Sequence, residues 1–363
     1  MKDIVDKVKQ LANENEQAVL ATIVGVDGST YRKEGAKMIF ARSGKQFGTI
    51  SAGCLEADIA LKIEGILDSG QPEILTYDMR SEEDLLWGLG SGCNGKIDVF
   101  VEPIFWEWIP PFQRLPIWPQ IDDLLKQGHH VAAAKSIDGQ IQASATCMLT
   151  DKGQVIGTLG SPEADRLVKE RLEQFLAQNE KKQTVVIEGL GTTFFLDRYE
   201  PKNKLFLFGA GPDAEPVARS ASKINFEVIV IDHRESRNTE EFFPDASQRI
   251  IAHPERALEE VPIHPEDYAL IMTHSFEKDR ILLSKLVQQP IKYLGVLGPI
   301  LRTQKLLDAE QLPEWIHSPV GLDIGADGPE EIAVSIMAEL LAVRNEKDSK
   351  TVKPRQAPTV LEL

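Results

Sequence analysis

Two glycine-rich loops in the first third of the chain each carry a cysteine. Cys54 follows Gly53 in the first loop, and Cys93 follows Gly92 in the second. The first loop runs into a stretch of helical apolar spacing, so Cys54 is predicted at a helix N-terminus, where the helix dipole favours the thiolate. A thiolate binds soft metals or carries sulfur, whereas Glu56 in the same turn opposes a second negative charge. Both cysteines are therefore candidate sulfur or metal ligands, and an inert buried role for each stays open.

A third glycine-rich turn, in the second half of the chain, has the residue types of a phosphate-binding loop. Apolar residues 205–208 predict a strand, and Gly209, Gly211, Asp213 and Ala214 follow it before a helical stretch. In this pattern the first glycine makes a tight turn, the second lets a phosphate approach the backbone, and the small residue allows close helix packing. Backbone N–H groups at the helix start then face the anion. The alternative is that the glycines only make the turn.

Three polar residues lie where neighbouring strands are predicted to end. Asp232 closes the next strand about 20 residues later, at the position where a carboxylate accepts hydrogen bonds from a ribose hydroxyl. Arg234 is either a phosphate contact or an exposed arginine at a strand end, and both interpretations stay open. His274 follows an apolar strand at the edge where doubly wound sheets bind ligands, which makes it a further candidate.

The elements that must position these residues fall into two bodies. From residue 201 to 345, strand-like runs alternate with helical stretches, which predicts a Rossmann-like, doubly wound parallel sheet. Residues 1–200 show a mixed α/β pattern, which predicts an N-terminal α/β domain with a proline- and tryptophan-rich connector near 103–119. It is expected to hold a strand over 141–149 and a helix with Ser161 as N-cap. Residues 346–363 are expected to be a disordered tail. No internal repeat is visible in the sequence.

Composition narrows the class of protein. The formal net charge of -16 at pH 7 repels phosphate backbones and anionic lipids, which argues against nucleic acid and membrane surfaces as partners. The N-terminal residues lack the pattern of a secretory signal, and no apolar run approaches the ~20 residues that span a bilayer. Three widely spaced cysteines suit a reducing compartment, and the scattered histidines argue against a structural zinc site. A cytoplasmic protein is the expectation.

Segments spread over most of the chain resemble one known family. They are GSTYRKEGAKM (28–38), GTISAGCLE (48–56), WGLGSGCNG (87–95), EP (102–103), FGAGPD (208–213), IDHR (231–234), MTHS (272–275), GVLGP (295–299) and HSPVGLDIGA (317–326). Together they are similar to the XdhC/CoxI family of xanthine dehydrogenase accessory factors. Two departures concern the cysteine loops: Ala52 and Asn94 stand where many members have glycine.

The resemblance implies a molybdenum cofactor chaperone more than a catalyst. Such a protein binds molybdopterin or its dinucleotide form and keeps it during sulfuration, for which a cysteine desulfurase is the implied partner. It then delivers the cofactor to a molybdenum hydroxylase apoenzyme of the xanthine dehydrogenase type, in purine catabolism. Residues implied at the site are Arg32 and Lys37 as anion contacts, Cys54 and Cys93 near the metal or its sulfur, and the Gly209 turn as phosphate cradle.

Two other classes of function stay open. An NAD(P)-dependent oxidoreductase would need a proton-transferring residue beside the nicotinamide, for which His274 and Asp279 are the candidates. A sulfurtransferase would carry a persulfide on Cys93. Base rates favour a homodimer. The cofactor hypothesis further predicts that a cysteine loop faces the Gly209 turn across a shared cleft.

Overall fold

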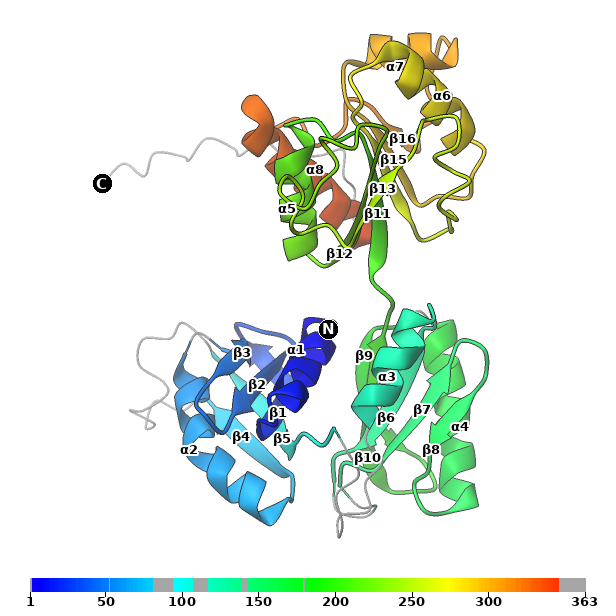
Figure 1. The fold of residues 1–363 in the computed structure, drawn as a ribbon. Coiled ribbons are helices and arrows are strands. Elements are labelled where there is room, and N and C mark those ends of the chain that lie inside the picture. Colours follow the sequence, from blue (N-terminus) through cyan, green and yellow to red (C-terminus); the bar gives the residue numbers. More distant parts are fainter. Residues whose placement is uncertain are drawn as a thin grey trace, which may run out of the picture. The chain divides into compact units, whose positions relative to one another are not determined.

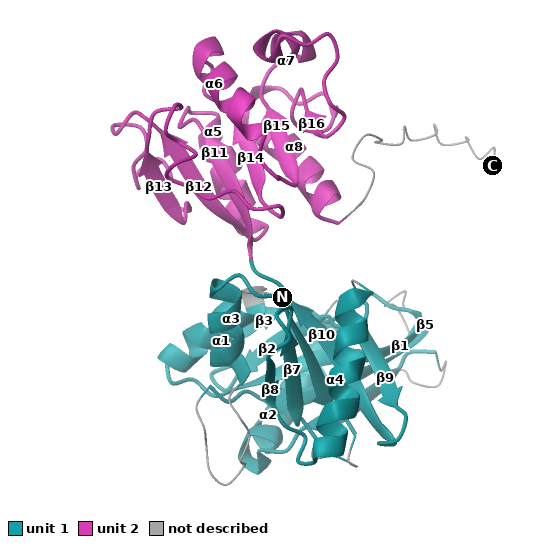
Figure 2. Ribbon diagram, turned by 90° about the vertical axis from the view of Figure 1, so that its right-hand side faces the viewer, with its two compact units in different colours: residues 1–201 teal, residues 202–363 magenta. Residues whose placement is uncertain are grey.

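The computed structural model describes residues 2–51, 53–80, 94–106, 117–138, 141, 143–178 and 180–345, with only the backbone of Lys2, Asp3, Cys54 and Asn94. The chain divides into two compact units, residues 1–201 (unit 1) and 202–363 (unit 2), which are coloured separately in Figure 2. No helix among the described residues is long and apolar enough to cross a membrane.

The first half of unit 1 is a helix followed by an antiparallel sheet that a second helix interrupts. Its elements are α1 (Lys2–Asn13), β1 (Ala18–Ser29), β2 (Lys37–Ala41), β3 (Gln46–Gly48), α2 (Cys54–Ser69), β4 (Glu73–Asp78) and β5 (Asn94–Pro103). The strands pair in the order β3-β2-β1-β5-β4. Apolar residues of α2 pack on one face of this sheet, and those of α1 contribute to a core that includes the other face.

The second half of unit 1 repeats this arrangement element by element. Its elements are α3 (Ile117–Lys126), β6 (Val131–Ser136), β7 (Thr146–Thr150), β8 (Val155–Gly157), α4 (Pro162–Ala177), β9 (Lys182–Ile187) and β10 (Thr192–Tyr199). The strands pair in the order β8-β7-β6-β10-β9. This is the order of the first sheet when each strand is replaced by its counterpart in the second half. The expectation of no internal repeat was therefore wrong: unit 1 contains two copies of one α-βββ-α-ββ topology (Figure 1).

The strand registers make individual residues of the two halves equivalent. Thr22 pairs with Lys37 in the first half as Lys135 pairs with Thr146 in the second, which matches Gly48 with Gly157. Both glycines have a positive φ, and a Cβ on either would collide with the carbonyl oxygen of the matching residue, Lys37 or Thr146. The edge strands β3 and β8 thus end at equivalent glycines with similar backbone conformations, although the two halves share few residue types around them.

Matching residues also form the contact between the two halves. A small buried cluster consists of Val24, Phe100, Ile137 and Phe195, which the registers arrange as two equivalent pairs. Beside it two ion pairs cross between the halves. Lys37 Nζ lies 2.6 Å from Asp197 Oδ2, and Lys135 pairs with Glu102, the residue equivalent to Asp197. The halves therefore share one interior.

Local signals in unit 1 were partly informative. Ser161 caps α4 as predicted, because its hydroxyl accepts a hydrogen bond from the Ala164 N–H at 3.1 Å. The expected strand over 141–149 was too long, since β7 begins only at Thr146. Helix α3 begins at Ile117, inside the segment expected to be a connector. Pro119 lies in its first turn, where a missing N–H breaks no hydrogen bond, and Trp118 is buried.

Unit 2 is a six-stranded parallel sheet with helices on both faces. Its elements are β11 (Asn203–Phe208), α5 (Ala214–Lys223), β12 (Phe226–Asp232), β13 (Gln248–Ile251), β14 (Tyr268–Ile271), α6 (Phe276–Leu286), β15 (Tyr293–Val296), α7 (Ile300–Leu307), β16 (Ile316–His317) and α8 (Gly328–Arg344). The strand order β13-β12-β11-β14-β15-β16 is that of the doubly wound dinucleotide-binding fold, which confirms the predicted fold class.

Two separate cores hold this sheet. Helices α5 and α8 contribute to one, and α6 and α7 to the other (Figure 1). The strand order reverses between β11 and β14, and ligands of this architecture bind at the carboxyl edge beside that reversal. The loops that follow β11, β12 and β14 are therefore where a ligand site is expected.

Candidate functional site

The turn after β11 is built as the sequence predicts. Gly209 has φ 119°, and a Cβ there would collide with the backbone of Met272, so no other residue fits. Its N–H donates to the Ile231 carbonyl at 2.9 Å, which ties the turn to the neighbouring strand. Ala214, the first residue of α5, is fully buried, as close helix-on-strand packing requires.

The space in front of Gly211 is occupied by a side chain of the same turn. A Cβ on Gly211 would lie 2.5 Å from Asp213 Oδ1, and Asp213 Oδ2 lies 2.7 Å from His274 Nε2. The structure thus brings together two residues that different sequence motifs pointed to. Pro212 offers no N–H, and a carboxylate stands where a phosphate would approach, so this turn accepts a phosphate only if Asp213 moves away. The phosphate-cradle role of the turn remains a prediction.

The carboxylate of Asp232 holds the glycine turn in place. It accepts hydrogen bonds from the Ala210 N–H at 2.7 Å, from the Arg234 N–H at 2.8 Å and from the Arg234 guanidinium. Burial opposes ionisation, but these hydrogen bonds outweigh it and lower the pKa of Asp232 to about 2. Asp232 and Arg234 are therefore engaged with each other, and their predicted contacts to ribose and phosphate would have to replace or extend these bonds.

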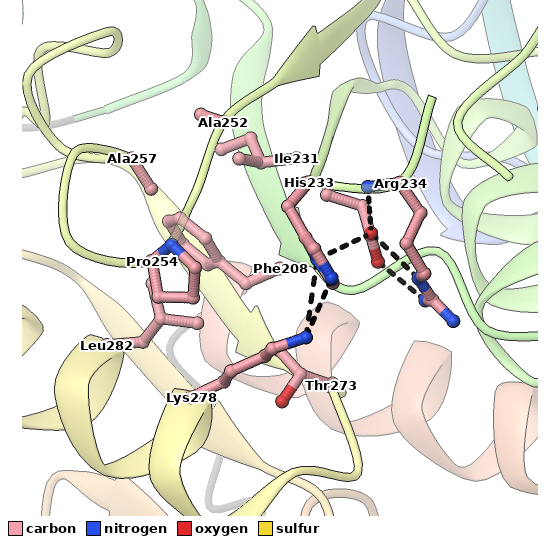
Figure 3. Close-up of a pocket in the computed structure, with 11 residues that line it drawn as sticks. Phe208, Ile231, His233, Arg234, Ala252, Pro254, Ala257, Thr273, Lys278 and Leu282 are labelled. Atoms are coloured by element: carbon pink, nitrogen blue, oxygen red, sulfur yellow. Dashed lines mark hydrogen bonds and ion pairs between the residues drawn. The ribbon is translucent and has the colours of Figure 1, made fainter. Parts of the chain in front are cut away.

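A pocket opens beside this pair, at the carboxyl ends of β11, β12 and β14. The space between its lining atoms amounts to about 430 Å³, a volume that includes open solvent outside the pocket. Its apolar wall is formed by Phe208, Ile231, Ala252, Pro254, Ala257 and Leu282. Its polar wall contains His233 and Lys278, which face each other in Figure 3. The position and the mixed lining are those of a ligand pocket in a doubly wound sheet.

Lys278, His233 and Asp232 form a chain of polar contacts along the pocket wall. Lys278 Nζ lies 2.8 Å from His233 Nε2, and His233 Nδ1 lies 3.1 Å from Asp232 Oδ1. An ammonium group can only donate, so Nε2 must accept and the ring proton sits on Nδ1, facing the carboxylate. Burial and then the Lys278 charge lower the pKa of His233, which keeps the ring neutral. Sequence reasoning missed Lys278, although it lies in the first turn of the helix after β14.

Asp279, the second proton-transfer candidate, is enclosed by structural contacts. It is 1% exposed, it accepts hydrogen bonds from the N–H and hydroxyl of Thr273, and Arg302 Nη2 lies 2.6 Å from its Oδ2. It anchors the loop after β14 to α7. The side chain of His274 is exposed, and its backbone has a positive φ of 60°, a conformation that residues other than glycine rarely adopt.

The first cysteine loop is organised by a buried carboxylate. Helix α2 begins at Cys54, as predicted, and Gly53 with φ 120° is its N-cap. Glu56 accepts hydrogen bonds from the Ser51 N–H at 2.7 Å and from the N–H groups of Ile50 and Gly53. Burial opposes its ionisation, but the Ser51 and backbone hydrogen bonds prevail and lower the pKa of Glu56. Cys93 and Gly92 lie outside the described residues, so their predicted roles remain predictions.

The two proposed anion contacts of unit 1 differ in accessibility. Lys37 is buried and paired with Asp197, so its ammonium already has an anionic partner. Arg32 is exposed in the loop between β1 and β2, and the stem of Lys182 lies over Gly35 of the same loop. Among the described residues, no group of three or more His, Cys, Asp or Glu side chains is arranged to hold a metal ion.

The six-stranded, doubly wound parallel sheet defines unit 2 as a domain of the Rossmann-like fold class. Comparison with known proteins is consistent with this class. The XdhC Rossmann domain matches residues 205–340, and the XdhC and CoxI family matches residues 11–78.

Similarity to known relatives extends over nearly the whole chain. A probable subunit of xanthine dehydrogenase from Bacillus subtilis (strain 168) is 40% identical over 334 residues, which cover 92% of this chain and 95% of the relative. The molybdenum cofactor insertion chaperone PaoD of Escherichia coli (strain K12) is 21% identical over 344 residues, which cover 93% of this chain and 86% of the relative. A crystal structure described as a xanthine dehydrogenase from Bacillus halodurans has a TM-score of 0.79, with 35% identity and 98% of each chain covered. The chain belongs to the XdhC and CoxI family, as the sequence motifs predict.

Proposed function

We propose that this protein is an accessory factor that binds molybdenum cofactor, keeps it during sulfuration and delivers it to a molybdenum hydroxylase of the xanthine dehydrogenase type. Family membership and the names of two relatives, one a probable part of xanthine dehydrogenase and the other a cofactor insertion chaperone, support this assignment. The observation that carries it is the pocket at the carboxyl edge of unit 2, which combines an apolar wall with a lysine.

The residues of this pocket fit the organic part of the cofactor. Molybdopterin and its dinucleotide form join a planar heterocycle to phosphate, and the pocket offers an apolar surface beside an ammonium group. The glycine turn fits less well in its present conformation, because Asp213 covers Gly211. When bound, the cofactor brings the metal centre that the receiving enzyme uses. This chain's residues would bind the cofactor, shield it and release it.

The thiols belong to the finer part of the proposal. Cys54 and Cys93 would stand near the metal or carry sulfur that a cysteine desulfurase supplies. Glycine has no side chain, so the glycine-rich sequences around both cysteines would let a large ligand approach the backbone. A homodimer would be the assembled form.

Reconstitution of a molybdenum hydroxylase apoenzyme tests the proposal. Purified protein is incubated with molybdenum cofactor, separated by gel filtration, assayed for bound molybdenum and added to the apoenzyme. We expect co-eluting molybdenum and faster recovery of hydroxylase activity than with free cofactor. The double variant C54S/C93S should bind less of the cofactor or transfer it less well. Turnover of NADH without any retention of molybdenum would instead support an oxidoreductase.

A further inference from the structure

The pocket beside the end of β12 contains a positive charge without an ionic partner. Among the residues that the structure describes, no carboxylate lies within ion-pair distance of Lys278 Nζ, which contacts the ring nitrogens of His233. The nearby cation Arg234 differs, because its guanidinium is paired with Asp232 at 2.7 Å. Lys278 is therefore the group of this pocket that is ready to receive an anion.

The neutral imidazole of His233 keeps Lys278 in this position. With Nε2 accepting from the ammonium and Nδ1 donating to Asp232, the ring can neither neutralise the lysine nor rotate without losing both contacts. Among the described residues the Lys278 ammonium contacts only this ring, so two of its three protons remain for a ligand. Asp232 is in turn fixed by the Ala210 N–H, so the chain of contacts is anchored on the glycine turn.

The carboxylate that usually reads a ribose hydroxyl at the end of the second strand is used internally here. The oxygens of Asp232 contact Ala210, Arg234 and His233. Because the Asp232 carboxylate is already occupied, the group at this edge that is ready to contact a ligand is the Lys278 ammonium, which would bind an anion instead of a hydroxyl group. The opposite wall, with Phe208, Ile231 and Leu282, suits a planar ring.

We infer that this pocket is a nucleoside-phosphate site, in which Lys278 contacts the phosphate, the apolar wall holds the planar base and His233 is the positioning residue for Lys278. The inference rests on the proposed function only for the source of the nucleotide. That source is either the nucleotide half of a dinucleotide cofactor or a free nucleotide.

Calorimetric titration of the full-length protein tests the site. The probes are CMP, GMP, AMP and their nucleosides without phosphate. We expect at least one monophosphate to bind, its nucleoside to bind at least about tenfold more weakly, and Lys278→Met to weaken the monophosphate by a similar factor. Lys278→Arg should restore most of the affinity. Lys285→Met is the matched control, because Lys285 lies on the same helix and bonds the Glu255 carbonyl instead.

The His233 variant separates positioning from general stability. In His233→Gln the amide oxygen can still accept from Lys278, so we expect affinity near that of the parent, whereas His233→Leu should lose about as much as Lys278→Met. Equal affinity of the parent and Lys278→Met for every monophosphate, or no binding of any of them at millimolar concentration, would overturn the inference.

Two further titrations identify the source and separate this inference from the proposed function. Nucleotide-free molybdenum cofactor and its dinucleotide form are compared in the parent and in Lys278→Met. Selective weakening of the dinucleotide form assigns the pocket to the cofactor's nucleotide half. Weakening of free monophosphates alone assigns it to a free nucleotide. Retention of both cofactor forms without any monophosphate binding leaves the proposed function standing and removes the nucleoside-phosphate site.

Discussion

Single residues at the carboxyl edge of unit 2 show how far the motif predicts the site. Gly209 and Ala214 do what their types predict, since backbone geometry and close packing leave no other choice. Asp232 illustrates the limit. The motif places an acid at the right strand end, but which donors the acid meets depends on the side chains around it. Lys278 was missed for the same reason, because its position opposite His233 exists only in three dimensions.

The buried carboxylate of Asp232 gives unit 2 a specific pH dependence. Its pKa is 3.8 in the unfolded chain and about 2 in the fold, a difference worth roughly 2 kcal/mol. Since the folded pKa is the lower one, this stabilisation is complete above about pH 5 and is lost as the pH falls towards 2. The free energy of unfolding of Asp232→Asn should therefore lie below that of the parent at pH 6, with the gap closing in acid. Urea unfolding at several pH values measures it, and a gap that does not change with pH would contradict the prediction.

At the scale of elements, strand-helix alternation was sufficient to predict the doubly wound sheet of unit 2. The fully buried strands of a parallel sheet are continuous apolar runs, which a sequence displays directly. The antiparallel sheets of unit 1 include strands as short as β3 and β8, and the two halves of the repeat share few residue types. Their equivalence rests on strand order and register, so the duplication stayed hidden until the pairings were known.

The ion pairs between the two halves of unit 1 should be far more sensitive to loss of one partner than to loss of both. In Lys37→Met the buried Asp197 loses its partner, and we expect a loss of roughly 3 to 5 kcal/mol in the free energy of unfolding. The double variant K37M/D197N removes the charge as well and should recover most of that loss. Chemical denaturation of both variants measures this.

An exposed ion pair provides the control. Arg166 and Glu170 lie one helical turn apart on α4 with both side chains more than half exposed, so Arg166→Ala should cost below about 0.5 kcal/mol. A Lys37→Met effect as small as this control would show that the buried pair does not hold the two halves together.

At the scale of the whole molecule, the buried apolar residues that the structure describes form two sets of cores that share no residues. The clusters of unit 2 draw only on residues after 202, and those of unit 1 only on residues before 201. The proposed domain boundary near residue 200 should therefore separate parts that can fold alone. The predicted proximity of a cysteine loop to the Gly209 turn is a statement about both units together and remains a prediction.

Fragments test this independence. We expect residues 202–345 and residues 1–201, produced separately, to unfold cooperatively with midpoints within about 5 °C of the corresponding transitions in the full chain. Circular dichroism with heating measures these midpoints. A fragment of residues 202–345 without a cooperative transition would show that unit 2 depends on unit 1.

The duplication in unit 1 also bears on how the chain continues from each half. Each half ends with a strand paired to its own first strand, but β5 is followed by the second half, whereas β10 leads into unit 2. These two strands are equivalent in topology, but only β10 connects unit 1 to unit 2. In the residues that the structure describes, two modules of one topology are thus followed by a doubly wound domain with its pocket.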